Sequence, residues 1–131
     1  MTKLPTVALM ALAAIQLATA CKTPEEKAVA ELKQCAQYFA HNKETLSWVR
    51  NVTFDVQKTD SLVSPIIGFV QCDTFDDGSR MRIVLAYQNG RWVVQGLSGW
   101  NVNTLEWGEP DADPRTIATY VDRLGLKKLP E

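Results

Sequence analysis

The sequence has only one histidine, His41, among its 131 residues, so a cluster of histidine metal ligands is excluded. Any Ser–His or Cys–His catalytic pair would have to use this residue, and its expected place near a helix end favours a capping role. The three cysteines form no C-x-x-C motif, which argues against thiol redox catalysis. Acidic residues slightly outnumber basic ones, so the basic surplus of nucleic-acid-binding proteins is missing. We therefore expect no catalytic residue, metal, cofactor or nucleic-acid partner.

The apolar run near the start of the sequence is shorter than the roughly 20 residues that a membrane-spanning helix needs. The first twenty residues have instead the three parts of a secretory signal. Lys3 supplies a positive charge, Val7–Leu17 forms an apolar core, and Ala18 and Ala20 offer small residues at a cleavage point. We therefore expect residues 1–20 to be a signal peptide that is removed on export.

The segment Ala18-Thr19-Ala20-Cys21 resembles the lipobox of bacterial lipoproteins, in which the cysteine after the cut carries the lipid. It departs from the lipobox at Ala18, where Leu is usual, and ordinary signal cleavage fits the same residues. The resemblance implies a protein anchored in the bacterial cell envelope through acylated Cys21. Lys22 resembles the residue that follows the anchor in outer-membrane lipoproteins facing the periplasm. The alternative is a soluble periplasmic or secreted protein.

About 110 residues remain after the signal, enough for one domain. We expect a tether at 21–26 and a single α+β domain at 27–131. Thr23-Pro24-Glu25-Glu26 predicts a helix start with a capping box, and helical apolar spacing then continues to about His41-Asn42. A continuation of the helix through Leu46 is less well supported.

After the helix the apolar period changes to two, which predicts four strands of an antiparallel meander. Two-residue turns at Asp77-Gly78 and Asn89-Gly90 join the last three strands. These turns place Cys72 opposite Ile83, Asp73 opposite Arg82, and Tyr87 opposite Trp92. The strands are expected around Val52–Val56 and at Ile66–Phe75, Arg80–Gln88 and Arg91–Leu97. One face of the sheet is then apolar and consists of Val70, Cys72, Ile83, Leu85, Tyr87, Trp92 and Val94.

Cys35 lies on the apolar stripe of the helix and Cys72 on the apolar face of the sheet. We predict a Cys35–Cys72 disulfide that links helix to sheet, because an odd free thiol is unfavourable in an oxidising compartment. The alternative is two buried free thiols. Acylation of Cys21 would leave these two as a pair, so the count of cysteines favours the lipoprotein over a soluble protein.

The segment after Leu97 contains Trp100 and Trp107 among Gly and Asn, and forms a fifth strand or an ordered loop. These tryptophans are candidates for a ligand or partner contact, and burial over the open end of the sheet is the alternative. Asp113-Pro114 then begins a short helix that ends at Gly125. We expect this helix to cover the other face of the sheet, on a row formed by Phe69, Ala86 and Val93.

A helix against an antiparallel meander, over about Pro24–Leu97, resembles the cystatin-like and NTF2-like α+β folds. The anchor, the expected disulfide and the missing catalytic residues favour a non-enzymatic envelope module that binds a protein, a glycan or an assembly component. The cystatin-like resemblance implies an inhibitor of a secreted hydrolase as one member of this class. The alternative, which the NTF2-like resemblance implies, is a small-ligand binder or enzyme with a pocket between helix and sheet. Tyr38, Tyr87 and His41 are the polar residues that could line such a pocket.

Overall fold

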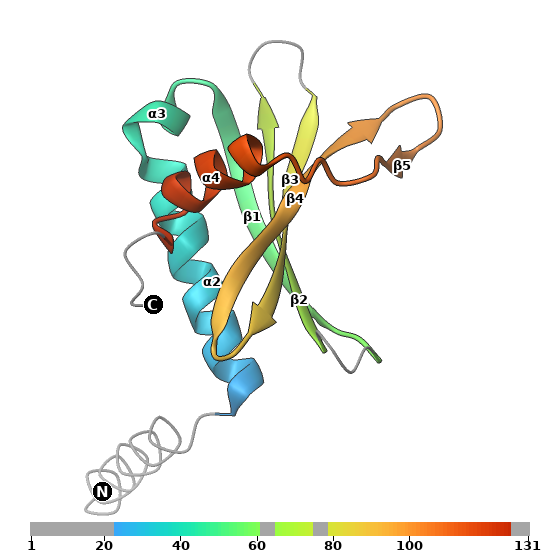
Figure 1. The fold of residues 1–131 in the computed structure, drawn as a ribbon. Coiled ribbons are helices and arrows are strands. Elements are labelled where there is room, and N and C mark those ends of the chain that lie inside the picture. Colours follow the sequence, from blue (N-terminus) through green and yellow to red (C-terminus); the bar gives the residue numbers. More distant parts are fainter. Residues whose placement is uncertain (1–22, 61–64, 75–78, 127–131) are drawn as a thin grey trace, which may run out of the picture.

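The computed structural model of the protein describes residues 23–60, 65–74 and 79–126. These residues form an α+β domain with a five-stranded antiparallel sheet in the order β1-β2-β3-β4-β5 (Figure 1). The predicted α+β class is confirmed, but the sheet has a fifth strand that the four-stranded meander lacked. The helices are α2 (Pro24–His41), α3 (Lys43–Leu46) and α4 (Pro114–Arg123), and the strands are β1 (Val49–Lys58), β2 (Ile66–Thr74), β3 (Arg80–Gln88), β4 (Arg91–Asn101) and β5 (Glu106–Trp107).

The long helix α2 begins where the capping box predicts. The Thr23 hydroxyl accepts a hydrogen bond from the Glu26 backbone N–H at 3.1 Å, and the Glu26 carboxylate accepts one from the Thr23 backbone N–H at 3.1 Å. At its other end His41 Nδ1 lies 2.8 Å from the Gln37 carbonyl oxygen, in agreement with a capping role. Asn42 ends α2 and its side chain caps the short helix α3, so the expected continuation through Leu46 is a separate element.

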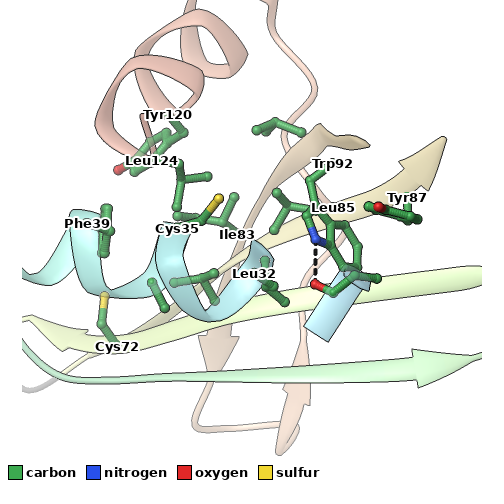
Figure 2. Close-up of a cluster of buried hydrophobic side chains, with 14 of the residues drawn as sticks. Leu32, Cys35, Phe39, Cys72, Ile83, Leu85, Tyr87, Trp92, Tyr120 and Leu124 are labelled. Carbon is green, nitrogen blue, oxygen red and sulfur yellow. Dashed lines mark hydrogen bonds between the residues drawn. The ribbon is translucent and has the colours of Figure 1, made fainter. Parts of the chain in front are cut away.

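The apolar face of the sheet packs against α2 and forms the core (Figure 2). Every residue predicted for this face is buried, and so are Leu32, Cys35 and Phe39 from the apolar stripe of α2. Trp92 joins the two layers: its indole N–H donates a hydrogen bond to the Ala28 carbonyl oxygen at 2.8 Å (Figure 2). Its ring centroid also lies 5.0 Å from that of Tyr87, its partner in the β3–β4 hairpin.

The β3–β4 register is the predicted one from the turn as far as Leu85 opposite Val94, and it includes Tyr87 opposite Trp92. A bulge after this pair shifts β4 by one residue, so that Ile83 lies opposite Leu97. Asn89 and Gly90 have positive φ, as the Asn-Gly turn requires. The predicted β2–β3 register is wrong by two residues. Cys72 lies opposite Met81 instead of Ile83, because the Thr74 N–H donates to the Ser79 carbonyl and the turn therefore contains the four residues between Thr74 and Ser79 instead of two. The predicted Asp77-Gly78 turn lies outside the described residues. A shift of two keeps each side chain on its face, so the predicted core is unaffected.

The C-terminal helix α4 has the predicted start, with the Asp113 side chain accepting from the Arg115 backbone N–H. Its predicted docking place is wrong. Tyr120 and Leu124 are buried in the same core as Phe39, so α4 lies on the same side of the sheet as α2 (Figures 1 and 2). The Phe39 and Tyr120 ring centroids are 6.3 Å apart. The amphipathic face of α4 therefore extends the core that α2 begins, and no helix of the described residues covers the opposite face of the sheet.

The predicted Cys35–Cys72 disulfide is not formed in the structure, where both residues are buried free thiols. They share one core, as expected, but Cys72 lies beside Phe39, whereas Cys35 points toward Leu124 and Ile83 (Figure 2). The register difference explains part of the error, since two residues along a strand are about 7 Å and a disulfide needs Cα atoms within roughly 7 Å of each other. The count of cysteines therefore no longer favours acylation of Cys21, which lies outside the described residues.

Burial should make both thiols unreactive in the folded protein. Desolvation raises the pKa of Cys35 to about 11, with a smaller effect from Glu31, and raises the pKa of Cys72 to about 12, with a smaller effect from Asp73. We expect iodoacetamide at pH 8 to leave both residues unmodified, and to modify both once the protein is unfolded in urea. Peptide mapping by mass spectrometry measures this. Resistance to labelling in urea that ends on addition of a reductant would instead show a disulfide.

The raised pKa values of Cys35 and Cys72 predict how the free energy of unfolding depends on pH. Unfolded thiols ionise near the ordinary pKa of 9.0, below the folded values, so the unfolded state loses protons first as the pH rises. The contribution of these groups to stability is therefore complete below pH 9 and is lost progressively between pH 9 and about 12. Urea unfolding at pH 8 and pH 10.5 should show a lower free energy of unfolding at the higher pH, and a smaller decrease in a Cys72→Ala variant.

Candidate binding surface

The face of the sheet opposite α2 and α4, here called the outer face, carries side chains that the core does not use. Side chains alternate across a strand, so the residues between the core positions of β2 and β3 lie on this face, and so do their cross-strand partners on β4, including those beyond its bulge. Cross-strand pairing places Phe69 opposite Val84, and Gln71 opposite Arg82, which in turn is opposite Ser98. The aliphatic and aromatic members are half-buried although no helix of the described residues covers them, and they include Ile67, Phe69, Val84 and Val93.

At one end of the outer face, aromatic rings and arginines come together. The Arg82 guanidinium carbon is 4.3 Å from the centre of the Phe69 ring and 4.5 Å from the centre of the Trp107 ring. Phe69 belongs to β2 on one side of β3, and Trp107 belongs to β5 beyond the other side. Arg82 is therefore held between two rings, a geometry that stabilises a cation through the negative faces of the rings. We call Phe69, Arg80, Arg82, Trp100 and Trp107 the arginine–aromatic cluster.

The two tryptophans singled out in the sequence meet in this cluster. Trp100 and Trp107 are partners in the β4–β5 pairing, and their ring centroids are 5.3 Å apart in an edge-on arrangement. Arg80 completes the cluster, with its guanidinium carbon 5.3 Å from the centre of the Trp100 ring. Both tryptophans are half-buried, so they are neither fully covered lids nor isolated surface residues. The short strand β5 has the effect of bringing Trp107 onto the outer face beside Arg82.

Two polar groups, one in the cluster and one beside it, lack hydrogen-bond partners in the described part of the chain. They are Arg82 Nε and the Ser98 hydroxyl, which are buried and belong to cross-strand neighbours. Desolvation lowers the pKa of Arg82 from its ordinary value.

The predicted pairing of Asp73 with Arg82 is wrong, because Asp73 lies opposite Arg80 and accepts a hydrogen bond from the Asn51 side-chain amide at 2.9 Å. Among the described residues, no carboxylate forms an ion pair with Arg80 or Arg82.

Sequence reasoning found the tryptophans of this cluster but missed its arginines and Phe69. The predicted two-residue β2–β3 turn gives Arg82 a structural partner in Asp73. The predicted docking of the C-terminal helix covers Phe69. The alternation of Arg80 and Arg82 with Met81 and Ile83 was the available signal, since it puts both cations on the face opposite the core.

A second candidate site is a hollow of about 300 Å³ between α2, β4 and the end of α4. Tyr38 lines it, but Tyr87 and His41 are not among its lining residues, so the structure does not gather the three proposed polar residues there. Burial raises the pKa of Tyr87 to about 12, helped by a hydrogen bond with Glu31. The lining residues are Glu31, Gln34, Cys35, Tyr38, Trp92, Leu124, Gly125 and Leu126.

Within the part of the chain that the structure describes, no group of three or more His, Cys, Asp or Glu residues is placed to hold a metal ion. In the same part, no helix has both the length and the apolar character needed to cross a bilayer. Comparisons with protein-family models, with curated proteins and with solved structures found no match for this chain. The residues themselves must therefore carry the functional argument.

Proposed function

We propose that this protein is an exported, non-enzymatic binding module of the bacterial cell envelope, and that it docks a partner protein on its outer face. One observation carries the proposal: the arginine–aromatic cluster lies on a sheet face that no described helix covers. Trp, Phe and Arg are enriched where proteins bind one another and supply most of the binding energy. The arrangement of helix and meander supports a cystatin-like or NTF2-like fold, but a fold alone does not assign a function.

The lipid anchor is a separate part of the proposal and rests on the signal segment and Cys21. We expect the protein extracted from membranes to begin at Cys21 and to carry a diacylglyceryl group and an amide-linked acyl chain. Intact-mass spectrometry of wild type and a Cys21→Ser variant measures this, and the variant should fractionate with soluble proteins. A wild-type protein that begins at Cys21 without added mass would show ordinary signal cleavage and a soluble periplasmic or secreted protein.

Photo-crosslinking in intact cells tests which face docks the partner. A benzoylphenylalanine residue is placed at Thr53 or Asp55, which are exposed on the outer face of β1, or at Gln37 or Tyr38 on α2. We expect a discrete crosslinked band from the two outer-face positions and none from the helix positions. Bands from Gln37 or Tyr38 alone would contradict the proposal.

Removal of one aromatic anchor should abolish this crosslink. Truncation of a central interface residue typically costs about 2 kcal/mol or more, so we expect Trp107→Ala to reduce the Asp55 crosslink at least tenfold. Val102→Ala is the matched control, because Val102 lies between β4 and β5 in the same hairpin and is 72% exposed. Its crosslink should stay within about twofold of wild type. Equal losses in both variants would count against a specific role of the cluster.

A small-ligand binder is the second candidate, and the hollow beside Tyr38 is the observation that favours it. Its volume of about 300 Å³ is at the lower end of the range for ligand pockets. Only Tyr38 of the three expected polar residues lines it. A crosslink to a small molecule from position 38, with no protein band from position 55, would favour this function.

A further inference from the structure

We propose that Arg82 is the binding site for a carboxylate, contributed by a Glu or Asp side chain of the partner protein. This inference rests on the proposed function, because it names the chemistry of the partner at the same surface. Three observations carry it: the cation is fixed between two rings, no acid of the described residues pairs with it, and buried polar atoms beside it have no partner among those residues.

The position of Arg82 prepares it for a planar anion. Phe69 and Trp107 occupy positions against the guanidinium group, so its side-chain conformation is restricted before a ligand arrives. The N–H donors of a guanidinium lie in its plane and point away from stacked rings, in the fork that matches the two oxygens of a carboxylate. Because the Arg82 side chain is already restricted, binding costs less conformational entropy.

The charge of the cluster favours an acidic partner. The protein as a whole carries a net charge of −1, yet Arg80 and Arg82 lie two residues apart on the same face without an ion pair in the described part of the chain. The nearest cross-strand acid, Asp73, accepts a hydrogen bond from Asn51 instead. Within residues 23–60, 65–74 and 79–126, Arg82 Nε and the Ser98 hydroxyl are also buried without partners, a state that normally requires an explanation. A bound oxyanion supplies the missing acceptor.

The neighbouring residues favour a protein over a glycan as the source of the carboxylate. A sugar ring stacks on a free aromatic face, but Trp107 already has Arg82 against it and Trp100 within 5.3 Å. Beside the cluster, Ile67, Val84 and Val93 give the outer face the half-buried aliphatic side chains that a protein surface can cover. An acidic side chain at Arg82 would then lie at the edge of an apolar contact.

The test is an NMR titration of the full-length ¹⁵N-labelled chain in detergent, observed at the side-chain Nε–H of Arg82 and the backbone amide of Ser98. The probes are N-acetyl-glutamate amide, its neutral counterpart N-acetyl-glutamine amide, glucuronate and inorganic phosphate, all at one ionic strength. We expect saturable shifts of both signals with the glutamate probe and none with the glutamine probe. Stronger binding of glucuronate would overturn the protein source, and equal or stronger binding of phosphate would overturn the carboxylate.

Substitutions distinguish recognition of the carboxylate by the planar guanidinium from attraction by its positive charge alone. Arg82→Lys keeps the charge but loses the planar fork, so we expect affinity for the glutamate probe to fall about tenfold. Ser98→Ala should lower it about threefold through the loss of one hydrogen bond. Arg115→Gln is the matched control and should change it by about twofold or less, because Arg115 lies on α4 outside the cluster and its side chain is 95% exposed. Amide spectra show whether each variant is folded, and the comparison of Ser98→Ala with Arg115→Gln remains informative if Arg82→Lys does not fold.

The outcomes distinguish this inference from the proposed function. Crosslinking from position 55 without any shift of Arg82 would mean that the outer face docks a protein through its aromatic and aliphatic residues alone, and the carboxylate site would be wrong. Shifts that are equal in wild type and Arg82→Lys would equally overturn it. Loss of both the crosslink and the shifts would remove the proposed function together with this inference.

Discussion

Replacement of Trp92 by Ala is expected to lower the free energy of unfolding by about 4 kcal/mol, which is typical when a large buried aromatic side chain is truncated. Trp92 is 3% exposed and touches both layers of the core. Its ring packs on Tyr87, and its N–H donates to the Ala28 carbonyl of α2. The variant therefore loses apolar contacts and the buried hydrogen bond between helix and sheet at the same time. Urea unfolding followed by far-UV circular dichroism measures the change.

Trp92→Phe separates the two contributions. Phenylalanine keeps most of the apolar contact but has no N–H, so the loss should be about 1–2 kcal/mol, close to that of one hydrogen bond and a small change in volume. A Phe variant as unstable as the Ala variant would show that the hydrogen bond to Ala28 dominates. An Ala variant within 1 kcal/mol of wild type would contradict the packing of α2 on β4 described above.

The core could be predicted from the sequence because its signals are local and repeated. The capping box at Thr23, the Asn89-Gly90 turn and the period-two alternation of β3 and β4 each fix backbone geometry within a few residues. Side chains change faces only when a register slips by an odd number. The two-residue error between β2 and β3 therefore left Cys72 in the core, although it placed the residue opposite the wrong partner.

The features that could not be predicted from the sequence are those for which two arrangements fit the apolar pattern. Helix α4 has an apolar face that fits either side of the sheet, and nothing in the sequence indicates that Tyr120 contacts Phe39. Once α4 joins α2, Phe69 is left uncovered and becomes part of the arginine–aromatic cluster. The candidate site thus depends on which face of the sheet α4 covers, and its local signal is the alternation of Arg80 and Arg82 with the core residues of β3.

The close approach of α2 to the sheet leads to the second large expected effect. Gly68 on β2 lies beneath Leu32 and Trp92, and a Cβ atom at this position would be 2.7 Å from Trp92 Cη2 and 2.8 Å from Leu32 Cδ2. Both neighbours are buried and cannot move freely. We expect Gly68→Ala to lower the free energy of unfolding by about 2–3 kcal/mol, and Gly68→Val to lower it by more, because overpacking forces side chains from their preferred rotamers.

Gly99→Ala is the matched control for this substitution. Gly99 also lies on the sheet, in β4, but a Cβ atom there would meet no atom within 4 Å. The restricted unfolded chain should make Gly99→Ala neutral or stabilising by up to about 1 kcal/mol. Chemical denaturation of the two variants side by side therefore compares the same methyl group in a closed and an open position. Equal stabilities would show that α2 does not pack against the sheet at Gly68. They would contradict the core packing that positions β3 and its two arginines.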